Sequence, residues 1–141
     1  MRLLSAPFDR HSGVAPFELK ESLSQLAERA LGPVRTAKAL KEGLTQLAEL
    51  KTNVLPQLAC RTRDLMWNRD WSDALECQAA FTVIESALLG ATGREHSIGA
   101  HQRHDNKQAE HGVLSHSLVT FNGSALVRDT APVAFSLVAR P

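Results

Sequence analysis

A polar stretch between residues 94 and 105 holds most of the side chains in this sequence that could perform chemistry. It reads Arg-Glu-His-Ser-Ile-Gly-Ala-His-Gln-Arg-His-Asp, and His111 and His116 follow shortly after it. Imidazole and carboxylate groups can bind Zn or Fe, so a metal site is chemically conceivable. No His-Glu-x-x-His pair occurs, however, and Gly99 and Gly112 prevent one helix from presenting the ligands together. We therefore expect a hydrogen-bonded polar corner without a metal.

Ser97 lies in the same stretch as His and Asp, the side-chain types that serve acyl transfer. The Gly-x-Ser-x-Gly turn that exposes such a nucleophile does not occur, and a Ser in a turn of small residues is usually structural. The glycine-rich patterns that cradle phosphates or dinucleotides do not occur either. We therefore expect no catalytic residue, no cofactor bound by this chain alone and no turnover without a partner.

Composition limits the classes of protein to which this sequence can belong. The 141 residues suit one domain, and 43% hydrophobic and 22% charged residues with a net charge of +1 disfavour both disorder and nucleic-acid binding. Aromatic residues make up only 5% and Tyr is absent, so Leu, Ala and Val must form the core. Such a core suits packed helices better than a β-sandwich.

Two features of the sequence bear on the cellular compartment: targeting signals and cysteine content. No apolar run approaches the roughly 20 residues that span a bilayer, and the N-terminal apolar stretch is too short for a secretory signal. We therefore expect no transmembrane segment. Cys60 and Cys77 lack the spacing of metal ligands, and Cys77 falls in an apolar helical stripe that suits a small buried thiol. The default expectation is a reducing cytoplasm.

Apolar periodicity predicts the helices that would position the polar stretch. Pro16 suits the first turn of a helix that ends at Leu31, before Gly32 and Pro33, with Gly32 expected to tolerate a left-handed cap. Thr36 is a suitable N-cap for a second helix bounded by Asn53 and Pro56. The buried stripe expected on that second helix consists of Leu40, Leu44, Leu47 and Leu50.

The strongest helical pattern lies just before the polar stretch. It runs from about Asp73 to Leu89, capped by Asp70 or Ser72, and is apolar around most of its circumference, as is typical of a central helix. A further, weaker helix would contain Leu55, Leu58 and Leu65. The predicted core consists of Leu23, Leu26, Leu40, Leu44, Leu47, Phe81, Ile84 and Leu88.

Beyond Asp105 the pattern changes from helical to extended. Residues 116–121 and 125–127 flank Asn122-Gly123, which is a strong signal for a β-hairpin, and Val133 to Val138 predicts a third short strand. The predicted fold class is therefore mainly α: a bundle of three or four helices followed by a small β-hairpin. Residues 1–15 are expected to form an extended N-terminal arm, and residues 16–141 a single domain whose β-element spans about 113–139.

Two Trp residues near the middle of the chain permit two interpretations. Trp67 and Trp71 flank Asn68-Arg69-Asp70. Trp serves equally well as a core anchor and as part of an interface, so the sequence leaves both roles open.

Two blocks of this sequence resemble the C-terminal helical domain of the succinate dehydrogenase and fumarate reductase flavoproteins, a superfamily that includes L-aspartate oxidase. The first is Gly32-Pro33-Val34-Arg35-Thr36 with its following Leu-rich helix, which resembles the Gly-x-x-Arg-Thr opening of that domain. The second is the helix from Glu76 to Leu89 leading into the polar stretch, and residues 66–68 resemble the region between the blocks. The matching positions of the polar stretch are Arg94, Ser97, Gly99, Ala100, His101, Arg103 and Asp105.

This sequence departs from the family motif at three positions. His96 stands where the motif has Glu, Ile98 where it has a second Arg, and Asn106 where a Pro usually follows. An ion pair between the motif's Glu and Arg is therefore not available to this chain. The catalytic residues, FAD-binding fold and capping domain of the family lie upstream of this domain, so none of them maps onto the sequence.

The resemblance implies a non-catalytic domain or small subunit that docks on and orders an FAD-bearing chain of a fumarate reductase or succinate dehydrogenase-like oxidoreductase. Arg94, Ser97, Gly99, His101, Arg103 and Asp105 would then serve structure or docking. The partner would be an FAD-containing oxidoreductase subunit, without nucleic acid, and a homo-oligomer is compatible with this function. The alternative is an independent interaction or assembly module without a flavin partner.

Overall fold

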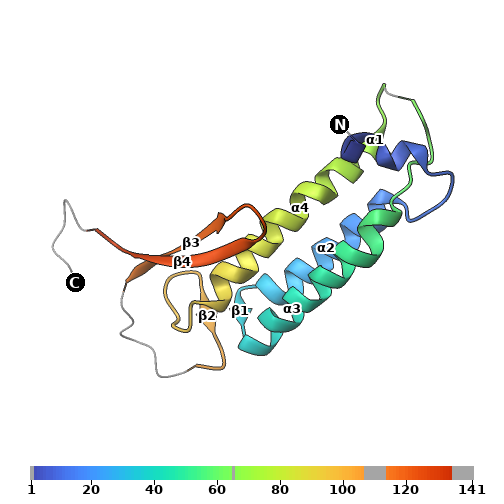
Figure 1. Ribbon diagram of the computed structural model, residues 1–141. Coiled ribbons are helices and arrows are strands. Elements are labelled where there is room, and N and C mark those ends of the chain that lie inside the picture. Colours follow the sequence, from blue (N-terminus) through green and yellow to red (C-terminus); the bar gives the residue numbers. More distant parts are fainter. Residues whose placement is uncertain (1, 65, 107–113, 135–141) are drawn as a thin grey trace.

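The computed structural model describes residues 2–64, 66–106 and 114–134 of the chain. Three helices, α2 (Pro16–Leu31), α3 (Ala37–Glu49) and α4 (Arg69–Thr92), pack side by side, and the antiparallel hairpin of β3 (Ser115–Phe121) and β4 (Leu126–Pro132) lies along the C-terminal half of α4 (Figure 1). The prediction of a mainly α fold with a small β-hairpin is confirmed.

The sequence signals at the ends of α2 and α3 act largely as expected. Pro16 occupies the first turn of α2, and the Thr36 hydroxyl accepts a hydrogen bond from Ala39 N at 3.1 Å to cap α3. Gly32 differs from the prediction, because its φ of −55° and ψ of 177° are extended rather than left-handed. The chain therefore leaves α2 directly into strand β1 (Val34–Arg35).

Helix α4 begins four residues before the predicted start. Asn68, rather than Asp70 or Ser72, is the N-cap, and its side-chain oxygen accepts a hydrogen bond from Trp71 N at 3.0 Å. Among the helices of the described residues, α4 is the one long and apolar enough to cross a membrane, a property that core helices of soluble proteins share. In this fold one face of α4 packs against α2 and α3.

The segment after α3 does not form the further helix that the sequence predicted. Instead, α3 widens into a π-helical turn, η1 (Leu50–Val54), followed by a 3-10 turn, η2 (Leu55–Gln57). Pro56 lacks the N–H that a continuing α-helix requires. Leu58 then forms an isolated parallel bridge with Val14, and Leu65 lies outside the described residues.

The N-terminal arm is not wholly extended, because residues Arg2–Asp9 form a short helix, α1. Pro7 lies within it, and its carbonyl accepts a hydrogen bond from Cys60 N at 2.9 Å. Arg10 donates to the Leu58 carbonyl at 2.8 Å. These contacts hold the N-terminal segment against the turn that precedes α4.

The core lies between α2, α3 and α4, as predicted. Leu44 and Leu50, both predicted to be buried, are the exceptions, because they are only partly buried against the core. Cys60 and Cys77 are both buried and free. The buried apolar residues of the three helices are Leu19, Leu23, Leu26, Ala30, Leu40, Leu47, Ala74, Cys77, Phe81, Ile84, Leu88 and Ala91.

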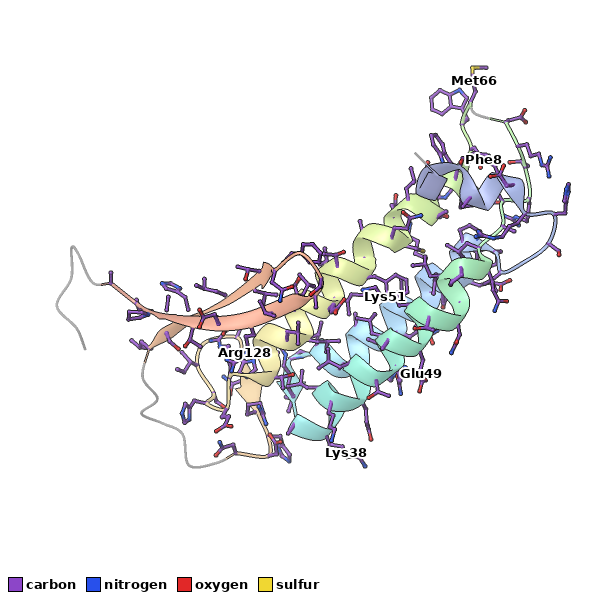
Figure 2. All side chains as sticks on the ribbon, viewed as in Figure 1. Phe8, Lys38, Glu49, Lys51, Met66 and Arg128 are labelled. Atoms are coloured by element: carbon purple, nitrogen blue, oxygen red, sulfur yellow. The ribbon has the colours of Figure 1, made fainter. Side chains whose placement is uncertain are left out.

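The hairpin turns at Asn122-Gly123, as predicted. Asn122 Oδ1 accepts hydrogen bonds from Ser124 N and Ala125 N, each at 3.0 Å, and Gly123 has a φ of +97° that favours glycine. The Arg128 guanidinium lies against Gly93 at the C-terminus of α4, where a cation complements the helix dipole (Figure 2). Of the third strand predicted over residues 133–138, only Val133 and Ala134 are described, and neither lies in a strand.

Replacing Gly43 by Ala is expected to destabilise the bundle. A Cβ at Gly43 would lie 2.7 Å from Ala30 Cβ and 3.2 Å from a Leu88 methyl group, so α3 would have to move away from α2. Overpacking costs about 1–3 kcal/mol, more than the roughly 0.5–1 kcal/mol gained in helix propensity. We expect urea unfolding to show a net loss of about 1–2 kcal/mol.

The matched control is Gly90→Ala within α4. A Cβ there would meet no atom closer than 3.9 Å, so only the propensity gain applies and stability should rise. Equal stabilisation by both substitutions would show that the helices do not approach closely at Gly43.

Candidate functional site

The predicted polar stretch folds against the segment that joins α2 to α3. Strand β1 pairs in parallel with β2 (Gln102–Arg103), and His104 N donates to the Arg35 carbonyl at 3.0 Å. We call this meeting point of residues 31–37 and 94–106 the corner. It lies at the end of the bundle where α2 and α4 finish and α3 begins (Figure 1).

His101 occupies the centre of the corner and is 3% exposed. Its Nδ1 lies 2.9 Å from Nη1 of Arg35, and its Nε2 lies 2.8 Å from the Arg94 carbonyl oxygen. A guanidinium only donates and a carbonyl only accepts, so these partners assign a neutral ring with its proton on Nε2. His101 therefore joins the segment before α3 to the segment after α4.

Arg35 ties the same corner to the end of α2. Its Nε donates to the Gly32 carbonyl and its Nη2 to the Leu31 carbonyl, both at 3.0 Å. Carbonyls at the end of a helix lack intrahelical donors, and a cation there complements the helix dipole. The Arg35 side chain thus supplies donors to the free carbonyls at the end of α2 and also positions His101.

Arg103 and Asp105 form a bidentate ion pair that reaches the start of α3. Arg103 Nε and Nη2 donate to the two Asp105 oxygens at 2.8 and 3.1 Å, and Nη1 donates to the Arg94 carbonyl at 3.0 Å. Asp105 also accepts from Ala37 N at 2.6 Å. The bonds from Arg103, and then that from Ala37, hold the pKa of Asp105 well below its usual range.

Ser97 and Gly99 shape the turn that carries these residues. The Ser97 hydroxyl accepts from Arg103 N at 2.9 Å and lies 3.4 Å from the Arg103 carbonyl oxygen. Gly99 has a φ of +59°, a conformation that glycine adopts without strain, and the flanking Ile98 and His101 exchange backbone hydrogen bonds. Ser97 is therefore engaged with the backbone rather than poised as a nucleophile.

The predicted site residues are thus brought together, and Arg35 joins them. Arg35 lies 66 positions before His101, so its place in the corner could be inferred only from the Gly-x-x-Arg-Thr block. His96 and His104 are exposed, whereas His111 lies outside the described residues. Among the residues that are described, no three His, Cys, Asp or Glu side chains are grouped so that they could hold a metal ion.

The polar groups of the corner are hydrogen-bonded within the protein. Every buried side-chain nitrogen and oxygen in the described part of the chain has a hydrogen-bond partner within the protein. The groups that might have contacted a cofactor instead bond to each other and to the ends of helices.

Protonation of His101 is expected to destabilise the corner. Burial, followed by the nearby charges of Arg94, Arg35 and Arg103, lowers the pKa of His101 below its ordinary value of 6.5, despite the hydrogen bond to the Arg94 carbonyl. The unfolded chain therefore binds this proton more readily than the folded chain does. The stabilisation is fully present above about pH 6.5 and is lost as the pH falls toward the folded-state pKa.

The measurement compares the free energy of unfolding of the wild type and His101→Gln at about pH 7.5 and pH 5.5. Gln keeps a donor for the Arg94 carbonyl but does not titrate. We expect the wild type to lose more stability than the variant on acidification, by at most about 1.4 kcal/mol for one histidine. Parallel pH dependences would contradict this assignment.

Comparison with known proteins identifies the family. The profile described as "Fumarate reductase flavoprotein C-term" matches residues 20–141. The chain therefore belongs to the family of fumarate reductase flavoprotein C-terminal domains, which confirms the resemblance seen in its sequence. It is 28% and 29% identical over 90 residues to the mitochondrial succinate dehydrogenase [ubiquinone] flavoprotein subunits A and B of Xenopus laevis.

Solved structures share the fold. A chain of the Mycobacterium smegmatis Sdh1 complex in the apo form matches 93% of this chain with a TM-score of 0.81 and 24% identity. A chain of E. coli quinol fumarate reductase matches 96% with a TM-score of 0.84 and 20% identity. The chain spans 13% of the two Xenopus subunits and 23% and 24% of the two structural neighbours.

Proposed function

We propose that this chain is a non-catalytic helical domain that docks on and orders the flavin-bearing part of a fumarate reductase or succinate dehydrogenase-like oxidoreductase. The observation that supports this proposal is that the polar atoms of the corner hydrogen-bond to other parts of the same domain. His101 and Arg103 bond to the Arg94 carbonyl after α4, and Asp105 accepts a hydrogen bond from the first residue of α3. Arg35 connects His101 to the end of α2. Such a network fixes a shape, which supports a structural role for the corner.

In this proposal the FAD belongs to a partner chain or to another part of the same polypeptide. The structural neighbours contain about four times as much chain as this domain matches, since it covers 23–24% of them. Their additional residues provide room for flavin and substrate sites that this chain lacks. The substrate would then be determined by the partner and not by this domain.

Affinity purification of the tagged chain from its native source tests the proposal. We expect a yellow complex that contains a flavoprotein, while the isolated domain should be colourless and redox-silent. A partner set that is consistently free of flavin would contradict the proposal and would favour the alternative, an interaction module without a flavin partner.

A further inference from the structure

The most exposed apolar side chains of the described residues lie at the end of the bundle opposite the corner. Met66 is 80% exposed and Trp67 is 100% exposed. Met66 lies at the tip of the loop that leads into α4, near α1 and its Phe8 (Figure 2), and Trp67 follows it in the sequence. A fully exposed Trp is unfavourable in an isolated domain, because its large apolar surface gains nothing from folding.

Two buried polar side chains hold this loop in one conformation. Asn68 donates to the carbonyls of Thr62 at 3.1 Å and Asp64 at 2.8 Å, in addition to capping α4. Asp70 accepts from Arg61 N at 2.9 Å and from Arg61 Nε and Nη2 at 3.0 and 2.8 Å. Each of the two clamping residues is only 6% exposed. The loop is therefore rigidly closed at its base.

The clamped loop forces Trp67 into a strained conformation. Its φ of +57° is the only positive value of a non-glycine residue in the part of the chain that the structure describes. This conformation is strained for a bulky residue and persists only where surrounding contacts over-determine the backbone. The strain does not produce an internal contact, since the side chain points entirely into solvent.

Trp71 differs from Trp67, and this difference decides between the core and interface roles that the sequence left open. Trp71 is partly buried and its ring lies 5.5 Å from that of Phe8. Trp71 therefore holds α1 against α4, and only Trp67 remains as a candidate interface residue.

The surroundings of Trp67 are suited to a protein partner. A hollow of about 550 Å³ beside it is lined by Trp71, Arg69 and the charged residues Lys20 and Glu76. The Arg69 side chain is 86% exposed. Arg63 is also exposed and donates a hydrogen bond to His11. Asp64 is an exposed carboxylate of the same loop. The cations of the hollow are paired, because Lys20 and Arg69 both lie against Asp73. An exposed aromatic side chain surrounded by charges of both signs matches an apolar pocket with a polar rim.

We propose that Trp67 is the anchor by which this domain docks on the flavin-bearing part of the oxidoreductase, in an apolar pocket with a polar rim. This inference rests on the proposed function. The additional chain present in the structural neighbours accompanies the same fold, so a surface of this domain must face it in such an assembly. Because Asn68 and Asp70 already hold the base of the loop, docking orders few additional groups there, which favours affinity.

Substitution of Trp67 by Asn separates anchoring from strain. Asn tolerates positive φ but removes the indole, so the free domain should be equally stable or more stable while docking weakens. We expect the affinity for the purified flavoprotein, measured by titration calorimetry with the full chain, to fall at least ~30-fold, as for an interface hot spot. Trp67→Phe should retain much of the affinity. Val83→Ala, at a site 67% exposed in the middle of α4, should retain all of it.

The outcomes are distinguishable. Undiminished binding of Trp67→Asn to the flavoprotein would overturn the anchor and leave the proposed function intact. Failure of the wild-type chain to bind any flavoprotein would overturn the proposed function and the anchor with it. Trp67-dependent self-association, or binding to vesicles of anionic lipid, without an effect on flavoprotein binding would also overturn the anchor.

Discussion

Replacing Phe81 by Ala is expected to lower the free energy of unfolding by about 3–5 kcal/mol, the usual cost of removing a buried aromatic ring. Phe81 is 1% exposed and lies on the face of α4 that carries Cys77, Ile84 and Leu88. The bundle is built around this helix, so neighbouring side chains cannot close the cavity without moving α2 or α3. Urea denaturation monitored by circular dichroism would give the difference.

Val83→Ala is the matched control for Phe81→Ala. It lies two residues away on the same helix but is 67% exposed, so its truncation should change stability by less than about 0.5 kcal/mol. A similar small loss for Phe81→Ala would show that α4 presents a different face to the bundle.

Replacing Arg103 by Ala is expected to cost about 2–3 kcal/mol, because it leaves charged and carbonyl groups without their donors. The Arg103 side chain is 6% exposed and bonds to both Asp105 oxygens and to the Arg94 carbonyl. Asp105 would keep the bond from Ala37 N but lose both donors of Arg103, and β2 would lose its side-chain bond to the Arg94 carbonyl. The free energy of unfolding near neutral pH measures this loss.

Arg69→Ala provides the control for the corner. Its side chain is 86% exposed and its Nε lies 3.9 Å from Asp73, so its loss should cost less than about 1 kcal/mol. Equal effects of the two arginine substitutions would contradict the role of Arg103 as the connector of the corner.

Local signals explain which parts of the fold were predictable. Pro16, Thr36 and Asn122-Gly123 act on their immediate neighbours, so α2, the start of α3 and the hairpin follow from the sequence. The early start of α4 was missed because Asn68, Asp70 and Ser72 are all good N-caps. Only the bonds of Asn68 to the preceding loop select it.

Long-range contacts explain what could not be predicted. The bond between Arg35 and His101 joins residues 66 positions apart, and neither residue carries a local signal for the other. The π-helical turn η1 likewise follows no local pattern in the sequence. Family resemblance located the polar stretch, but the assignment of each hydrogen bond required the fold.

The central claim is that the corner supports an oxidoreductase without taking part in its chemistry. The most direct test uses the recovered complex in which this chain carries Arg103→Ala, at a temperature where the variant is folded. The quantity measured is the rate of succinate oxidation or fumarate reduction per assembled complex. We expect assembly to weaken while the rate per assembled complex changes by less than about 3-fold, because no transition-state interaction is removed. Intact folding and assembly with a rate lowered by about 10²–10⁴-fold, as when an acid–base group is lost, would contradict the account.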